Sequence, residues 1–139
     1  MQTFLPYPSF KQSAEALDYK RLGKQRIEAM TIYDILTERT KTIAWTHHPA
    51  LLMWKRYEDA LALYYNCIRQ EWIRRGFNNT MPEINVYPTI NFPCWLGNDR
   101  FHSSHKGNLL RKDPVFYGKY GWTESPDLPY IWPTKEGLM

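Results

Sequence analysis

The chain has 139 residues, a length typical of one domain. Hydrophobic residues make up 43% and charged residues 23%, which is too rich in core-forming side chains for a disordered protein. No apolar run approaches the ~20 residues of a membrane span, and the first residues lack the charged and apolar stretches of a signal peptide. We therefore predict one cytoplasmic domain over residues 1–139, without a membrane segment.

Charge and aromatic content favour an anionic polymer as partner. Lys and Arg number 18 against 14 Asp and Glu, which gives a net charge of +4, and aromatic residues make up 16%. Basic patches attract phosphates, and exposed rings stack on bases. The two cysteines, Cys67 and Cys94, have no paired spacing, so neither a disulfide framework nor a cysteine zinc site is indicated.

The N-terminal third predicts an arm followed by a long helix. Residues 1–8 are apolar and contain two prolines, which is typical of an extended segment. Ser9, with Gln12 three residues later, has the spacing of a helix-capping box. No proline follows until the connector at 38–47, so we predict one helix from Phe10 to about Leu36, with Gly23 as its weak point.

A second long helix is predicted to begin at the His48–Pro49 pair, because proline is favoured in the first turn. It runs to Gly76, a residue that commonly ends helices. Residues 77–97 contain three prolines and predict an irregular loop. Asn98 or Asp99 can cap a third helix to about Leu110, and an aromatic, turn-rich segment follows. The predicted fold is all-α: a compact single domain of two long helices and a shorter third, with an N-terminal arm and an aromatic C-terminal segment.

Charged residues interrupt an apolar stripe of the first predicted helix. At ~100° per residue, Arg21, Lys24 and Glu28 share a sector with apolar residues. Burying unpaired charges costs several kcal/mol. Spacing alone favours an ion network in which Glu28 pairs with the two cations; the alternative is a cleft where a carboxylate and cations face a substrate.

Three segments carry a family resemblance: MQTFLPYPSFKQSAEALDYKRLGKQRIE, HHPALLMWKRYE, and HSSHKGNLLRKDP with the later PYIWP. Together they resemble the pyrimidine dimer DNA glycosylases (the phage endonuclease V-like family), in its divergent bacterial and phage branch. The resemblance implies an all-α domain with no metal or cofactor. It also implies that the N-terminal amine attacks C1′ of a damaged nucleotide, expels the base and forms a Schiff base. A helix glutamate assists, and β-elimination then cuts the strand.

Carried onto this chain, the nucleophile is the α-amine of Met1, which we expect to be retained because Gln2 is bulky. An α-amine ordinarily has a pKa of about 7.7–8, so a useful fraction is neutral near pH 7. At the family's usual glutamate position this chain has Arg21. Glu28 lies on nearly the same helical sector about two turns later and is the predicted catalytic carboxylate. Asp18 is nearer in sequence but points to another side.

The resemblance also implies a set of DNA contacts. Cations of the first helix would hold phosphates, an aromatic C-terminal loop would approach the damaged base, and a histidine would stand near the amine. The predicted DNA-binding residues are Lys20, Arg21, Lys24, Arg26, His47, His48, Arg111, Lys112, Lys119, Tyr120 and Trp122. Most rings of the C-terminal segment are expected in the core, with Tyr120 and Trp122, flanked by glycines, as the exceptions.

Two alternatives remain open from the sequence. Arg21 at the glutamate position suits a DNA-binding module without catalysis. His102 and His105, three residues apart, suit a metal-dependent nuclease if further ligands join them. We favour the metal-free glycosylase and lyase, with duplex DNA carrying a damaged or modified pyrimidine as partner and the protein as a monomer. The base removed does not follow from the residues.

Overall fold

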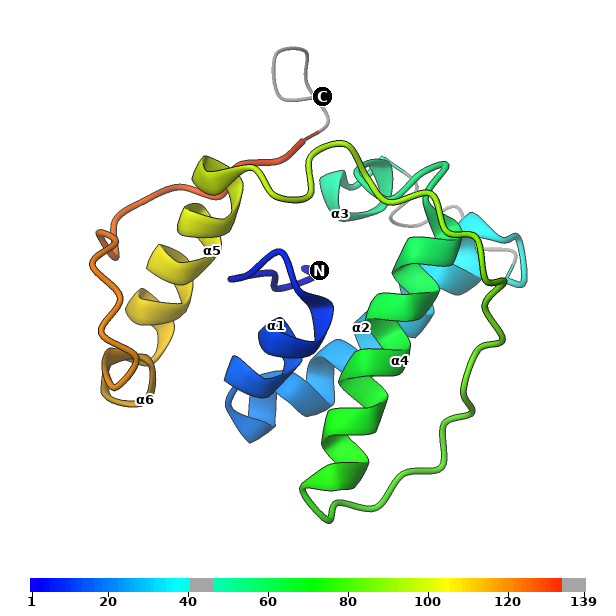
Figure 1. The fold of residues 1–139 in the computed structure, drawn as a ribbon, viewed down its shortest axis with the longest axis horizontal. Coiled ribbons are helices and arrows are strands. Elements are labelled where there is room, and N and C mark those ends of the chain that lie inside the picture. Colours follow the sequence, from blue (N-terminus) through cyan, green and yellow to red (C-terminus); the bar gives the residue numbers. More distant parts are fainter. Residues whose placement is uncertain (41–46, 134–139) are drawn as a thin grey trace.

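The fold is a set of helices arranged around the N-terminal arm (Figure 1). The computed structural model describes residues 1–40 and 47–133, and in these ranges every regular element is a helix, as predicted. None of the helices described there has the length and apolarity needed to cross a bilayer. The helices are α1 (Phe10–Ala16), α2 (Tyr19–Leu36), α3 (Pro49–Leu52), α4 (Glu58–Arg74), α5 (Asp99–Lys112) and α6 (Pro114–Gly118).

The first predicted helix is two helices, because the chain turns extended at Leu17 and Asp18. Asp18 caps α2 through its side chain, which accepts from the amide of Arg21. The hydroxyl of Tyr117 donates to the Asp18 carboxylate and accepts from the Asp18 amide at 3.0 Å. The prediction of one helix from Phe10 to Leu36 is therefore wrong: a tyrosine 99 residues away holds the break open.

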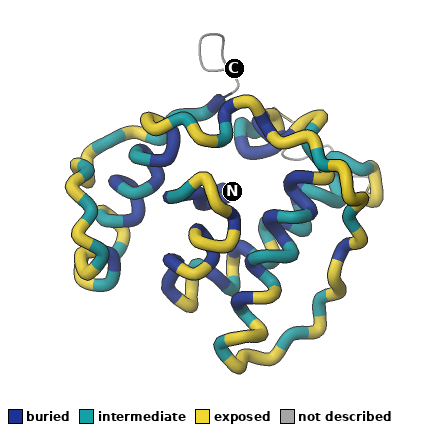
Figure 2. The backbone as a smooth tube through the Cα atoms, in the orientation of Figure 1, coloured by how far each residue is buried: buried dark blue, intermediate teal, exposed yellow. Residues whose placement is uncertain are grey.

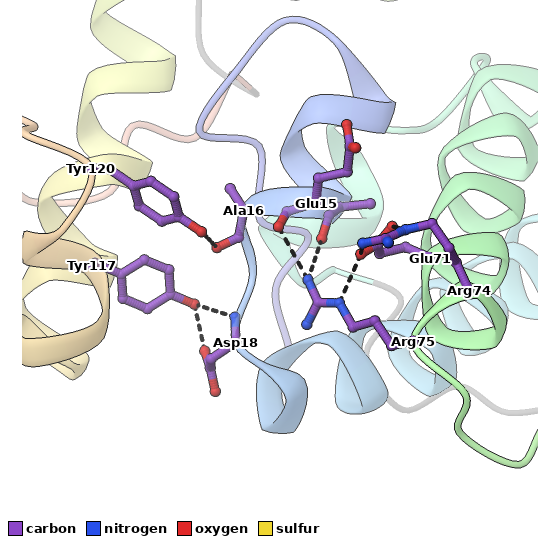
Figure 3. A network of polar contacts seen from close by, with 9 residues as sticks. Glu15, Ala16, Asp18, Glu71, Arg74, Arg75, Tyr117 and Tyr120 are labelled. Atoms are coloured by element: carbon purple, nitrogen blue, oxygen red, sulfur yellow. Dashed lines mark hydrogen bonds and ion pairs between the residues drawn. The ribbon is translucent and has the colours of Figure 1, made fainter.

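Long-range contacts also satisfy the backbone that this break exposes (Figure 3). The last carbonyls of a helix have no partner within it. Here Arg75 of α4 donates to the carbonyl of Glu15 at 3.1 Å, and the Tyr120 hydroxyl donates to that of Ala16 at 2.9 Å. Glu71 pairs with Arg75 at 2.7 Å and holds its guanidinium in place. The end of α1 is thus fixed by α4 and by the segment after α6.

The second predicted helix is also interrupted. It begins at Pro49 as predicted, with His48 as the cap, but α3 ends at Leu52 and α4 starts only at Glu58. In between, Arg56 adopts a left-handed conformation with φ 74°, and the Met53 carbonyl accepts from the Trp95 indole at 3.0 Å. The interruption seats Trp54 in the core, fully buried. The third helix is capped by Asn98 as predicted, and α6 was not predicted.

The N-terminal arm lies in the core rather than on the surface. In Figure 1 the N-terminus sits between α5 on one side and α2 and α4 on the other. Residues 2–6 are buried, and Leu5 is fully enclosed. Figure 2 shows that the turns of α4 and α5 facing this interior are buried as well. The helices therefore close around the arm, which ends at the only amine that belongs to the backbone.

Candidate active site

The arm brings the N-terminus to the predicted glutamate. The amide of Gln2 donates to Glu28 Oε2 at 3.3 Å. The α-amine of Met1 is separated from that amide nitrogen only by the Cα and carbonyl carbon of one residue. The side chain of Glu28 is only 17% exposed. The structure thus brings together the two groups that the sequence assigned to catalysis, although they are 27 positions apart.

Gln25 organises this junction, and sequence analysis did not identify it. Its Nε2 donates to the Gln2 carbonyl at 2.7 Å and to Glu28 Oε2 at 3.1 Å. Its Oε1 accepts from the Phe4 amide at 3.0 Å and from the Tyr64 hydroxyl at 2.8 Å. A buried side-chain amide that uses donors and acceptor together has one allowed orientation. Gln25 therefore fixes the arm and the Glu28 carboxylate relative to each other.

A cleft of about 430 Å³ opens beside Met1 and Glu28. Lys20, Arg21 and Lys24 of α2 line one wall, and Lys112 at the end of α5 faces them. Burial lowers the pKa of Lys112, and the nearby cations, Arg21 first, lower it further. Four cations around one opening are a site for an anion such as a phosphate.

The ion network that spacing favoured forms only in part. Lys24 lies 3.8 Å from Glu28, as predicted. Arg21 pairs instead with the helix cap Asp18 at 3.1 Å. Asp18 is held by Tyr117 at the start of α2 and is not among the residues that line the cleft. Both interpretations of the α2 stripe therefore describe the same place: a partial ion network on the wall of a cleft.

His48 lies within electrostatic reach of both reacting groups. Burial lowers its pKa, the positive N-terminal amine lowers it further, and Glu28 opposes the shift. Its Nδ1 accepts from the Ala50 amide at 3.0 Å and caps α3. The ring packs edge-on against Trp132, at 5.9 Å between centroids. Residues 1–46 contain no histidine, so a histidine from α3 occupies the surroundings of the amine.

Aromatic residues form the remaining wall of the cleft. Phe4 of the arm lines it together with Tyr130 and Trp132 of the C-terminal segment. Tyr130 and Trp132 contact each other, at 5.8 Å between centroids. The sequence contained the signal, because the PYIWP stretch carries part of the resemblance, but the glycine-flanked pair Tyr120 and Trp122 was selected instead.

The comparisons agree with this geometry. The family model described as pyrimidine dimer DNA glycosylase matches residues 1–85. The chain belongs to this family. The matched part holds the arm, α1 to α4, and the residues Met1, Glu28 and His48. No curated protein and no solved structure matches the sequence. Membership assigns the protein in general terms to the DNA glycosylases of DNA repair.

In this family member, some predicted DNA contacts lie away from the cleft. The Arg26 guanidinium sits 4.6 Å from the centroid of the Trp72 ring and donates to Asn79, which braces α2 against α4. Lys119 lies over the Phe116 ring at 3.8 Å. His47 is exposed one residue before the α3 cap, and Arg111 is exposed beside Lys112 on α5.

Tyr120 and Trp122 are half-buried rather than free. Their rings stack on each other, with centroids 5.1 Å apart. The Tyr120 hydroxyl bonds the end of α1, and the Trp122 indole donates to the Tyr7 hydroxyl at 3.0 Å. Neither residue lines the cleft. Their rings join α6 to the arm, and contact between them and DNA stays a prediction.

His102 and His105 are buried on α5, where both contact the arm. His102 uses both ring nitrogens, one toward the Leu5 carbonyl and one toward the Gly97 amide. In the described part of the chain, no three His, Cys, Asp or Glu side chains gather as metal ligands. A metal-dependent nuclease built on this pair would have to break the contacts that hold the arm.

Proposed function

We propose that this protein is a DNA glycosylase with abasic-site lyase activity that works through a Schiff base on its N-terminal amine. The substrate is duplex DNA with a damaged or modified pyrimidine, a pyrimidine dimer first of all. One observation carries the proposal: the arm runs through the core and ends beside Glu28 in a cationic cleft. An N-terminus without a function would have no reason to be buried in this way.

The chemistry needs only groups that the cleft provides. The neutral amine of Met1 attacks C1′, and the bond to the base breaks; the base leaves with the electron pair and takes a proton. The amine loses a proton, the C1′–O4′ bond opens, and O4′ is protonated, which leaves an imine between the amine and C1′. Removal of a C2′ proton then expels the 3′ phosphate. Glu28, beside the amine, is suited to accept the protons and to stabilise the positive charge of the imine.

The walls of the cleft fit the two faces of such a substrate. Lys20, Lys24 and Lys112 offer positive charge for the phosphates that flank the lesion. The rings of Tyr130 and Trp132 offer a stacking surface for a base that has left the duplex. Attack at C1′ requires the nucleotide to leave the stack, so both surfaces serve the same step.

Borohydride trapping tests the proposal. Duplexes carrying a cyclobutane pyrimidine dimer or an abasic site are incubated with the protein and borohydride, with and without a chelator. Intact mass first establishes that Met1 carries the amine. We expect a covalent adduct that resists the chelator and disappears when the α-amine is acetylated.

Two glutamine variants assign the carboxylate. Glu28→Gln keeps the size and removes the charge, and we expect adduct formation to slow by about 10²-fold or more, the scale of a general acid–base group. Glu15→Gln changes an exposed glutamate of α1 and is expected to react like the wild type. Binding of DNA without any adduct would refute the lyase and leave a DNA-binding module, while cleavage lost to the chelator would point to a metal-dependent nuclease.

A further inference from the structure

Two buried histidines of α5 hold the backbone of the arm at one residue. The Leu5 amide donates to His105 Nδ1 at 2.9 Å, and the Leu5 carbonyl accepts from His102 Nδ1 at 2.7 Å. Both rings are almost fully enclosed, with exposures of 1% and 4%. We call this arrangement the histidine clasp: His102 and His105 around the Leu5 backbone.

The two rings have complementary protonation states. The Gly97 amide donates to His102 Nε2 at 2.9 Å, so in the neutral ring the proton sits on Nδ1 and is donated to Leu5. His105 accepts at Nδ1, so its proton sits on Nε2. Each neutral tautomer matches one polar group of a single peptide residue. A buried extended segment with no strand beside it has no other way to satisfy these groups.

The clasp is the outermost of a row of contacts that lead to the amine. From Leu5 toward the terminus, Gln25 bonds the Phe4 amide and the Gln2 carbonyl, and the Trp54 indole donates to Thr3 at 3.0 Å. The position of Leu5 therefore sets how far the following residues reach toward Glu28. His105 also packs on Phe4 and Tyr130, two rings of the cleft wall, at 6.3 and 5.6 Å between centroids.

We propose that His102 and His105 are positioning residues for the nucleophile: through the Leu5 backbone, α5 sets the position of the Met1 amine relative to Glu28. The inference rests on the proposed Schiff-base function. Neither histidine touches the reacting atoms, so their effect falls on the rate of adduct formation and not on DNA affinity. A misplacement of the attacking group by 1 Å can cost about 10²-fold in rate.

Three variants separate positioning from general stability. His105→Leu removes the acceptor for the Leu5 amide and keeps an apolar side chain. His105→Asn keeps an acceptor, because Oδ1 of asparagine takes the place of Nδ1. Asn66→Leu is the matched control: Asn66 forms the same kind of clasp on another segment, bonding the Ile84 amide at 3.0 Å and the Ile84 carbonyl at 2.8 Å.

The measurement is the single-turnover rate of borohydride trapping on saturating abasic-site duplex, with the DNA dissociation constant measured separately. We expect His105→Leu to slow trapping at least about tenfold, with His105→Asn and Asn66→Leu near the wild type and similar affinity throughout. Equal rates in His105→Leu and the wild type would overturn the inference. So would an equal loss in Asn66→Leu, or no rescue by asparagine.

Amide hydrogen exchange gives a second readout that needs no catalysis. We expect the Leu5 amide to exchange slowly in the wild type and in Asn66→Leu, and much faster in His105→Leu. If His105→Leu does not fold, the wild type and His105→Asn carry the test: a fast-exchanging Leu5 amide in either refutes the clasp. If the wild type forms no adduct, the proposed function fails; the positioning role fails with it, while slow exchange at Leu5 would still establish the clasp as a structural contact.

Discussion

Burial of His105 makes the stability of the fold depend on pH between neutral and acid. Burial, aided by the nearby His102, lowers the pKa of His105 from 6.5 to about 3. In the unfolded chain the same ring takes up a proton near pH 6.5. Between these two values the unfolded state binds more protons than the folded one. The contribution of the neutral ring is therefore complete above pH ~6.5 and is lost as the pH falls toward 3.

The size of the effect follows from the two pKa values. Well inside this interval each pH unit is worth about 1.4 kcal/mol for one site. The unfolded ring is only partly protonated near pH 6.5, so the loss from pH 7 to pH 5 comes to about 2 kcal/mol. Carboxyl groups titrate mostly below pH 5, and this interval therefore reports mainly on histidines.

The His105→Asn variant isolates this contribution. Asparagine keeps an acceptor for the Leu5 amide but does not titrate, so its free energy of unfolding should fall by about 2 kcal/mol less than that of the wild type between pH 7 and pH 5. Urea unfolding at pH 7, 6 and 5 and constant ionic strength measures the difference. His102 and His48, whose pKa values burial also lowers, leave a residual pH dependence in both proteins.

The exposed His47 provides the control, because His47→Asn should retain the full loss of the wild type. Equal losses in His105→Asn and the wild type would refute the reasoning. His105 would then take up its proton in the folded state as readily as in the unfolded chain, and its contact with the arm would be wrong.

Three further predictions concern the cleft and its support. Lys20→Ala and Lys24→Ala should each weaken DNA binding regardless of sequence and lower the salt slope of log Kd by about 1, measured by titration at several salt concentrations. Gly23→Ala should destabilise by about 1–3 kcal/mol in urea, because its Cβ would lie 2.8 Å from the Trp72 ring; a gain in stability would contradict the close approach of α2 and α4. Glu71→Ala should cost about 2–3 kcal/mol, since two arginines lose a buried carboxylate, while an unchanged trapping rate would show that the cleft is intact.

The sequence by itself determined the features that depend on neighbouring residues. Ser9 and Asn98 cap α1 and α5 because a side-chain oxygen reaches an amide three residues ahead. Pro49 begins α3, and Gly76, with φ 87°, follows α4. The family and the pairing of the N-terminus with Glu28 also came from sequence, because residues seven apart share a helical face and the resemblance supplied the amine.

Tertiary structure alone decided where the helices break and which residues reach the amine. Tyr117 holds the break at Asp18 from 99 positions away, and no local pattern contains that contact. The clasp on Leu5 joins residues about 100 positions apart. Such contacts form because a buried backbone group must find a partner, and only the folded chain shows which partner lies within reach. Composition could predict an aromatic wall, whereas the path of the chain after α6 chose Tyr130 and Trp132 to build it.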